Sequence, residues 1–145
     1  MKLTTKGRYG ARLMLDLAIH YNNGPVLLRE IAKRQDISEK YLGQIVRPLI
    51  TEGLVKSARG AHGGYFLAKP PKSITLKDII EVLEGSLAIV ECIDTPSLCS
   101  RMKSCLTRNI WKEVTDKVTK VLENITLEDM VSRHYKDYNN PVYNI

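Results

Sequence analysis

Two short helical patterns separated by a few residues set the tightest constraint on how this chain can fold. LREIAK at residues 28–33 places its apolar side chains on one side of a short helix. After a break at residues 34–37, Ser38 can cap a second helix whose apolar residues recur at helical spacing up to Leu49. Two short helices joined in this way form a helix-turn-helix. Because Pro48 removes a backbone donor, we expect the second helix to kink or end there.

A hairpin pattern follows the helix pair. Residues 54–57 and 65–68 are two short apolar runs, and RGAHGG at residues 59–64 supplies three glycines that permit the positive φ angles of a hairpin tip. An earlier helix is predicted over residues 9–20 and should stop at the Asn-Asn-Gly-Pro sequence of residues 22–25. The predicted fold class is therefore mainly α with a small β-wing, a winged helix-turn-helix domain followed by a long helix.

Positive charge is concentrated in the part of the chain that contains these elements. Residues 1–70 carry 12 Lys and Arg against 5 Asp and Glu, a net charge of +7, whereas residues 71–145 carry 10 against 11, a net charge of −1. A basic segment of this kind favours a polyanion, because each neutralised phosphate releases condensed counterions. We therefore expect double-stranded DNA as the partner, with a merely well-solvated basic surface as the alternative.

Composition excludes several other classes of protein. The apolar runs are far shorter than the ~20 residues of a membrane helix, and the first six residues lack the apolar core of a signal peptide. We therefore expect a cytoplasmic protein with no membrane association. The three cysteines cannot all pair within one chain, so a disulfide framework does not explain them.

The helix pair and the wing nominate a set of DNA-binding residues. A recognition helix offers its N-terminal polar side chains to base edges in the major groove, while a basic wing lies at the neighbouring minor groove. The candidates are Ser38, Lys40, Tyr41 and Gln44 in the second helix, and Arg59 and His62 in the wing. Gln44 suits the paired donor and acceptor of adenine, and Arg59 suits a narrow minor groove. In the alternative interpretation, Tyr41 is a core residue and Lys40 is simply solvated.

The cysteines form a second constellation. Cys92, Cys99 and Cys105 are spaced C-x6-C-x5-C within residues 91–105, which have no helical or strand period and are expected to form a loop. Neither interval matches the short C-x2-4-C spacing that is usual for structural zinc. Three thiolates on one loop can instead converge on an iron–sulfur cluster. Spacing alone leaves a cluster, redox-active thiols and unligated cysteines open.

A long apolar stripe begins after the cysteines. From Thr107 onwards apolar residues recur in steps of one, three and four over about five helical turns. The stripe consists of Ile110, Trp111, Val114, Val118, Val121, Leu122 and Ile125. A helix-turn-helix protein commonly works as a two-fold dimer on a palindromic site, so we interpret the stripe as a homodimer interface. Packing of the stripe within its own chain is the alternative.

These features divide the chain into three parts. The predicted parts are residues 1–72, a winged helix-turn-helix DNA-binding domain; residues 73–106, a connecting helix and the cysteine loop; and residues 107–145, a dimerisation helix and a C-terminal tail. Thr75 should cap the connecting helix, which ends near Gly85. Thr126 and Asp129 form a capping-box pattern at the start of a short last helix, and the end of the chain from Tyr135 is expected to be loose.

Several separated motifs, in this order, resemble one family of bacterial transcription regulators. They are KLTTKGRYGARLMLDLA, LREIAKRQDIS, KYLGQIVRPL, RGAHGGYFLAK, ITLKDIIEVLEG, C-x6-C-x5-C followed by LTRNIW, and LENITLEDMV. Together they make residues 1–131 similar to the IscR/NsrR/CymR family. The resemblance implies a homodimeric winged helix-turn-helix repressor or dual regulator, in which the long helix packs against its partner and the cysteine loop binds an iron–sulfur cluster.

The resemblance assigns three of the four cluster ligands. It implies that Cys92, Cys99 and Cys105 hold the cluster, and it favours 2Fe-2S over 4Fe-4S. Regulators of the IscR type carry a histidine at the position of Arg108, and other members carry a carboxylate near Arg8, so the fourth ligand is unassigned. The candidates are Glu91, Asp94, His20, His134, a residue of the partner chain and water.

One further departure concerns DNA reading. Recognition helices of the IscR type often carry a glutamate immediately before the glutamine, whereas Gly43 precedes Gln44 in this chain. A carboxylate at that position would repel phosphate and disfavour some sites. Its absence leaves open whether the state of the cluster changes the sequence preference.

The sequence therefore predicts a transcription regulator whose operator affinity is coupled to an iron–sulfur cluster. No nucleophile, base and orienting group share a motif, and neither a phosphate loop nor a paired-carboxylate site is visible, so we do not expect an enzyme. An enzyme would need metal chemistry at the cysteine loop. The other alternative is a metal-free regulator controlled by cysteine oxidation or by a partner protein.

Overall fold

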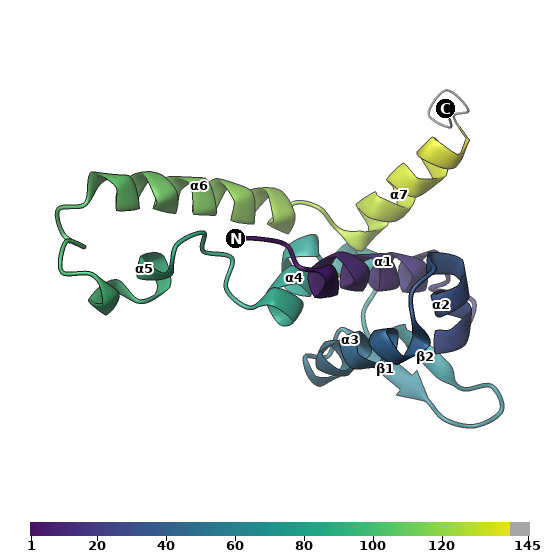
Figure 1. Cartoon of the computed structure of the whole chain (residues 1–145). Coiled ribbons are helices and arrows are strands. Elements are labelled where there is room, and N and C mark those ends of the chain that lie inside the picture. The colour runs from purple at the N-terminus through teal and green to yellow at the C-terminus, as the bar shows by residue number, and fades with distance from the viewer. Residues whose placement is uncertain (140–145) are drawn as a thin grey trace.

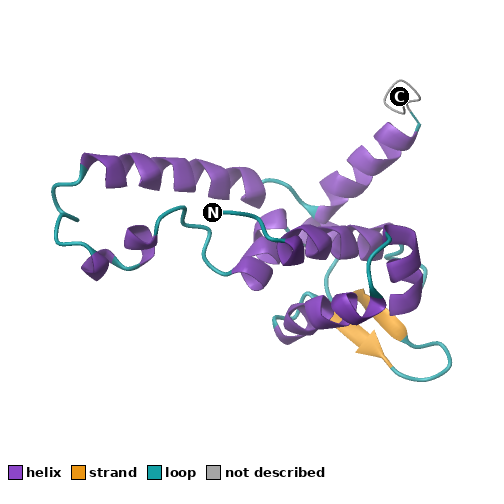
Figure 2. Cartoon of the chain, viewed as in Figure 1, coloured by secondary structure: helices purple, strands orange, loops and turns teal. Residues whose placement is uncertain are grey.

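A computed structural model describes residues 1–139 of the chain. Over these residues the protein is mostly helical, with one two-stranded antiparallel sheet. Figure 1 shows a head built from the first helices, the hairpin and the helix that follows it, while a long helix extends away from this head and the last helix projects from it in another direction. Figure 2 shows that strand structure is confined to the hairpin. The expected fold class, mainly α with a small β-wing, is confirmed.

The elements follow one another in a simple order. The helices are α1 (Thr5–Ile19), α2 (Leu28–Gln35), α3 (Glu39–Thr51), α4 (Leu76–Glu84), α5 (Glu91–Asp94), α6 (Leu106–Glu123) and α7 (Leu127–Tyr138); the strands are β1 (Val55–Ala58) and β2 (Gly64–Leu67); and short 3-10 turns span Pro71–Ser73 and Pro96–Leu98. Relative to the predicted strands, the hairpin is displaced by one residue toward its turn.

The helix-turn-helix is formed by α2 and α3. The chain leaves α2 at Asp36, whose φ of 53° and ψ of 50° lie in the left-handed region. The hydroxyl of Ser38 then accepts a hydrogen bond of 3.2 Å from the backbone N–H of Tyr41, which confirms the predicted cap. This tight turn fixes the direction in which α3 leaves α2.

A buried carboxylate on α1 clamps the end of α2. Asp16 is only 2% exposed, and it accepts hydrogen bonds from Nη2 of Arg34 at 2.7 Å and Nε of Arg34 at 3.0 Å. The amide of Gln35 adds a third hydrogen bond at 3.0 Å, and the Asp16 hydrogen bond raises the pKa of Arg34. A buried charge with a two-point partner resists displacement, because separating them would leave the carboxylate unpaired.

The expected early end of α3 at Pro48 is wrong. The helix continues for three residues beyond Pro48 and ends at Thr51. Proline removes one hydrogen bond, to the carbonyl of Gln44, and Gln44 lies on the exposed side of the helix where water can satisfy that group. On the opposite side Ile45 and Leu49 are fully buried, so core packing outweighs the missing bond.

Two close backbone contacts hold the hairpin against the segment that precedes α2. Val26 and Tyr65 exchange backbone hydrogen bonds of 2.8 Å in each direction, so the segment before α2 pairs with β2. Gly64 has a φ of +146°, and a Cβ there would lie 2.6 Å from the carbonyl oxygen of Val26. A side chain at position 64 is therefore excluded both by the positive φ angle and by the nearby Val26 carbonyl.

Helix α1 packs closely on α4 through its glycines. A Cβ at Gly10 would lie 1.9 Å from Cδ1 of Leu83, and one at Gly7 would lie 2.4 Å from Oε1 of Glu84. The carboxylate of Glu84 accepts hydrogen bonds from the backbone N–H groups of Thr4 at 2.8 Å and Gly7 at 3.1 Å. The last residue of α4 therefore caps the first turn of α1, where the helix dipole favours a negative charge.

The segment around the cysteines is more ordered than expected. The predicted loop over residues 91–105 contains the short helix α5 and a 3-10 turn, because the carbonyl of Glu91 accepts a hydrogen bond from the Thr95 N–H and the carbonyl of Thr95 accepts one from the Leu98 N–H. Helix α6 starts at Leu106 and ends at Glu123, so Ile125 lies beyond it and does not extend the helical stripe. Asn124 ends the helix as its C-cap.

The capping patterns of α4 and α7 are both present. Thr75 with Asp78 and Thr126 with Asp129 form reciprocal capping boxes. Helix α7 continues to Tyr138, so the expectation of a loose end from Tyr135 is wrong over residues 135–138, and residues 140–145 lie outside the described part of the chain. Among residues 1–139, no helix has the length and apolar character needed to cross a membrane.

We predict that Gly10→Ala lowers the free energy of unfolding by about 1–3 kcal/mol, because its methyl group would overlap Leu83. Gly43→Ala is the matched control, since its Cβ would meet only Cδ2 of Leu28 at 3.8 Å and alanine favours a helix by about 1 kcal/mol. Urea unfolding at one protein concentration measures both. Equal shifts of the two midpoints in the same direction would contradict the close packing of α1 on α4.

Candidate nucleic-acid interface and cysteine loop

The sequence-predicted DNA-binding residues belong to α3, its N-cap and the turn of the β1–β2 hairpin. Figure 1 shows α3 and the β1–β2 hairpin together at the end of the head that is remote from α6. Exposed side chains are Ser38, Lys40, Gln44, Arg59 and His62, whereas Tyr41 is half-buried. The geometry thus places the first turns of a helix beside a glycine-rich turn that carries an arginine and a histidine.

Tyr41 has a packing role that the sequence left open. Its ring meets the ring of Tyr9 edge-to-face, with centroids 5.9 Å apart and an interplanar angle of 85°. The guanidinium groups of Arg12 and Arg8 lie 5.4 and 6.0 Å from the Tyr9 ring centroid. Tyr41 therefore anchors the start of α3 to α1, and two exposed cations of α1 stand beside this anchor.

Two shallow hollows border α3 and extend the candidate interface. One, of about 530 Å³, lies between the start of α2 and the hairpin, with Arg29 and Arg59 in its lining. The other, also about 530 Å³, lies on the face of α3 that carries Lys40, Gln44 and Arg47. Arg29 and Arg47 are exposed cations that the candidate list omitted. Helical spacing was the signal for Arg47, because residues 40, 44 and 47 share one face.

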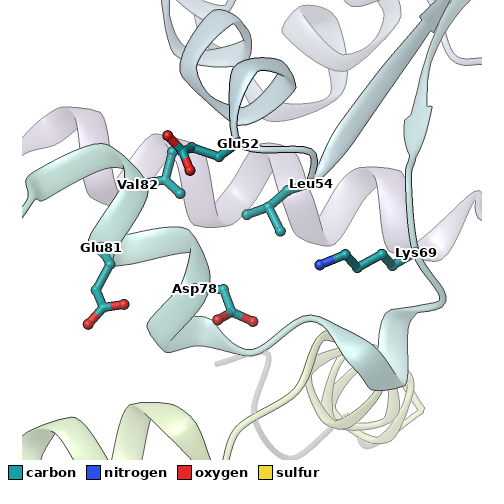
Figure 3. Close-up of a pocket in the computed structure, with 6 residues that line it drawn as sticks. All are labelled: Glu52, Leu54, Lys69, Asp78, Glu81 and Val82. Atoms are coloured by element: carbon teal, nitrogen blue, oxygen red, sulfur yellow. The ribbon is translucent and has the colours of Figure 1, made fainter.

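A third hollow has a different character and lies between α3 and α4. Its volume is about 430 Å³, and Figure 3 shows Lys69 reaching toward α4 across a lining that includes Glu52, Asp78 and Glu81. Three carboxylates against one ammonium group disfavour a phosphate backbone. This hollow therefore does not extend the candidate DNA-binding surface.

The three cysteines lie on the excursion between α4 and α6. Cys92 is in α5, Cys99 follows the second 3-10 turn, and Cys105 is the N-cap of α6. Cys99 is exposed, the other two are half-buried, and none forms a disulfide. Over residues 1–139 no three His, Cys, Asp or Glu side chains are gathered closely enough to hold a metal ion. The fold thus places the thiols on one excursion without bringing them to one point.

Arg108 connects two of the cysteine positions. Its backbone N–H donates to Sγ of Cys105 at 3.4 Å, and its side-chain Nε donates to the carbonyl of Cys92 at 3.3 Å. The Thr107 hydroxyl lies 3.3 Å from the same sulfur. Two hydrogen bonds lower the pKa of Cys105 below the usual range of a thiol. The bond with Thr107 has the larger effect, and the bond from the Arg108 N–H has the next largest. A lowered pKa increases the ionised fraction of the Cys105 thiol, which favours both metal binding and oxidation.

The candidates for a fourth ligand are spread over the fold. Glu91 and Asp94 lie on α5 beside Cys92, and Asp94 is hydrogen-bonded to Ser86. His20 belongs to the C-cap of α1, where its Nδ1 lies 2.8 Å from the Asp16 carbonyl oxygen. His134 is in α7, against the Tyr135 ring. None of these contacts singles out a ligand.

Comparison with known proteins identifies the family. Residues 3–133 match the model of the Rrf2 family, described as an iron-dependent transcriptional regulator. The chain belongs to the Rrf2 family. The resemblance noted from the motifs is thereby confirmed, and the protein is a transcription regulator of this family, not an enzyme.

Individual members of the family are similar over nearly the whole chain. The transcriptional regulator CymR of Bacillus subtilis is 45% identical over 132 residues, which cover 91% of this chain and 91% of CymR. The solved structure of CymR, titled the global cysteine regulator of B. subtilis, superposes with a TM-score of 0.78 and covers 92% of this chain and 98% of that one. The solved structure of IscR from T. potens is 44% identical, with a TM-score of 0.76 and coverage of 92% and 88%.

We predict that Thr107→Val raises the pKa of Cys105 in the reduced, metal-free protein, because the largest stabilising contact to its thiolate is lost. Alkylation of Cys105 by iodoacetamide near pH 7 should then slow, since a smaller fraction of the thiol is ionised. Cys99, which is exposed, serves as the internal control in peptide mass spectra. An unchanged rate at Cys105 would contradict the assigned hydrogen bond.

Proposed function

We propose that this Rrf2-family protein is a homodimeric DNA-binding repressor whose operator affinity is coupled to an iron–sulfur cluster held by Cys92, Cys99 and Cys105. The observation that carries the DNA-binding part is the shared surface of α3 and the hairpin, on which Lys40 and Arg59 are exposed. A bacterial regulator that binds operators would work in the cytoplasm, the compartment that holds the chromosome.

The DNA would be read by two elements at once. Helix α3 enters the major groove with Ser38, Lys40 and Gln44 toward base edges, and the hairpin turn brings Arg59 and His62 to the minor groove. Because the Ser38 hydroxyl already accepts the cap hydrogen bond, it retains its proton as a donor to DNA. Tyr41 contributes mainly by holding α3 on Tyr9.

The long helix α6 supports assembly through its exposed apolar face. Leu106, Ile110, Trp111, Val114 and Val121 are each 39–72% exposed in the single chain. A contiguous apolar helix face of this size favours a partner surface, and a second copy supplies an identical face related by two-fold symmetry. We therefore assign residues 1–72 to DNA binding, residues 73–106 to the connection and the cysteine loop, and residues 107–145 to dimerisation and the tail.

The cysteine excursion suits an iron–sulfur cluster by the chemistry of its donors. Three thiols occur within one short segment, and the hydrogen bonds from Arg108 and Thr107 favour the ionised form of Cys105. When bound, a cluster supplies redox chemistry and a shared centre for the three sulfurs. The family description as iron-dependent supports this assignment, and the 2Fe-2S type is the one we propose.

Contacts within the chain connect the cysteine excursion to the DNA-binding head. The Ile89 N–H donates to the Thr115 hydroxyl of α6 at 3.4 Å, and Lys77 of α4 lies 3.9 Å from Glu123 at the end of α6. At its other end α4 caps α1 through Glu84. A change in the conformation of the cysteine excursion can therefore shift the position of α4 relative to α1, and with it the orientation of the head.

A metal-free regulator is the second candidate. The observation that favours it is the lowered pKa of Cys105, because an ionised thiol reacts readily with oxidants. Similarity to the protein titled the global cysteine regulator also supports a signal connected with cysteine. Iron and acid-labile sulfide analysis after anaerobic purification separates the two candidates.

We predict that Gln44→Ala weakens binding to a specific operator by about 1–3 kcal/mol and has little effect on random DNA, as expected for a base contact. Arg47→Ala is the matched comparison on the same helix face and should weaken both DNAs, because a cation toward phosphate is not sequence-selective. Fluorescence anisotropy at one salt concentration measures both variants. A uniform loss for Gln44→Ala would contradict its role in reading bases.

We predict that Val121→Glu dissociates the dimer, because Val121 is 58% exposed on the apolar face and a carboxylate there would be desolvated in the interface. Lys120→Glu is the matched control, because it introduces the same side chain at an adjacent exposed position that is already polar, and it should leave the dimer intact. Sedimentation velocity and binding to a two-half-site operator provide the measurements. A Val121→Glu protein that still sediments as a dimer would place the interface elsewhere.

We predict that Cys99→Ala abolishes visible cluster absorbance and shifts operator affinity relative to the cluster-loaded protein by about 5–150-fold, the usual size of an allosteric coupling. Ser104→Ala, in the same excursion but without a thiol, should leave both properties unchanged. Both proteins are reconstituted anaerobically and titrated at one salt concentration, because the phosphate contribution otherwise hides the difference. Equal affinity of wild type and Cys99→Ala would remove the proposed coupling.

A further inference from the structure

The polar face of α3 contains one apolar depression. The hollow of about 530 Å³ on this face is lined by Leu28, Glu39, Lys40, Gly43, Gln44 and Arg47. Among these six residues Leu28 is the one aliphatic side chain, and Gly43 is the one residue without a side chain. The depression therefore combines an apolar surface with a backbone that can be approached closely.

Leu28 and Gly43 lie next to each other in this hollow. A Cβ built on Gly43 would meet a single side-chain atom within 4 Å, Cδ2 of Leu28 at 3.8 Å. That distance is an ordinary van der Waals contact, so the Gly43 backbone and the Leu28 side chain border the same space, and no other side chain fills it at Gly43. Leu28 is itself half-buried against the core, which keeps its position fixed.

The charges around the hollow indicate which part of DNA faces it. Lys40 and Arg47 are exposed cations suited to phosphates, whereas the Glu39 carboxylate at the rim repels a phosphate. Gln44, in the same lining, carries the amide suited to adenine. The depression is therefore directed at base edges, with the cations serving the backbone on its flanks.

We propose that Leu28 and Gly43 form a specificity pocket for the C5-methyl group of a thymine near the base contacted by Gln44. In the major groove the thymine methyl is the apolar group that a T·A pair displays, and it distinguishes this pair from the others. This inference rests on the proposed binding of α3 in the major groove, and it adds two residues that carry no hydrogen-bonding side chain to the set that selects the operator.

Replacement of thymine by deoxyuridine tests the pocket, because the two bases pair identically and differ only in the methyl group. An operator obtained by selection from random DNA with the wild-type protein is substituted one thymine at a time, symmetrically in both half-sites. Wild type should lose about fourfold in affinity per half-site at one thymine position, the amount expected for one buried methyl group.

Two variants assign that loss to the pocket. Leu28→Ala should bind the thymine and uracil operators with equal affinity, because the surface that touches the methyl is gone. Gly43→Ala should bind the uracil operator at least as tightly as the thymine operator, because its own methyl fills the space. Arg47→Ala is the control and should weaken both operators while retaining the thymine preference.

The outcomes separate this inference from the function on which it rests. Failure of the selection to yield any preferred sequence would overturn both. A preferred operator without a thymine-to-uracil loss at any position would overturn the pocket alone, as would a loss that persists unchanged in Leu28→Ala and Gly43→Ala.

Discussion

The close packing of α1 on α4 is the contact on which the rest of the structure depends. Gly10 allows Leu83 to reach the α1 backbone, and Glu84 supplies the capping charge that no local side chain gives to α1. Helix α4 also contacts α6, so α4 connects the head to the long helix. In the proposed dimer, the relative orientation of the two α3 helices would follow from how rigidly α1 and α4 are packed, because cores rearrange in discrete steps rather than by continuous bending.

Local patterns predicted most of the fold, and long-range polar contacts were the part they missed. The Ser38 cap and both capping boxes depend on residues three positions apart, which a single sequence displays directly. The Asp16–Arg34 pair joins residues 18 positions apart, and the Glu84 cap joins residues 80 apart, so neither leaves a local pattern. The expectation that α3 ends at Pro48 was wrong for a related reason. Tertiary packing of the helix, rather than the low helix propensity of proline, decides where α3 ends.

The candidate site shows the same division between local and long-range information. The first turns of α3 and the hairpin turn lie on one surface, as the order of the elements indicated. Tyr41 could not be assigned from the sequence, because its half-buried state depends on Tyr9, which lies two helices away in the chain. The arrangement of the thiols was also beyond prediction, since residues 91–105 lack a period and their geometry depends on contacts such as that of Arg108 with Cys92.

The anchoring of the hairpin has a consequence for how regulators with this architecture diverge. Gly64 cannot accept a side chain because the Val26 carbonyl lies against it. Within the turn, a Cβ at Gly63 would lie 2.4 Å from the carbonyl oxygen of Ala58, and Gly60 has a φ of +100°. The hairpin glycines are therefore constrained by the backbone, whereas the exposed turn positions Arg59, Ala61 and His62 can change at little cost to stability. Duplicated genes would acquire new operators through substitutions at these three turn positions long before their folds drift apart.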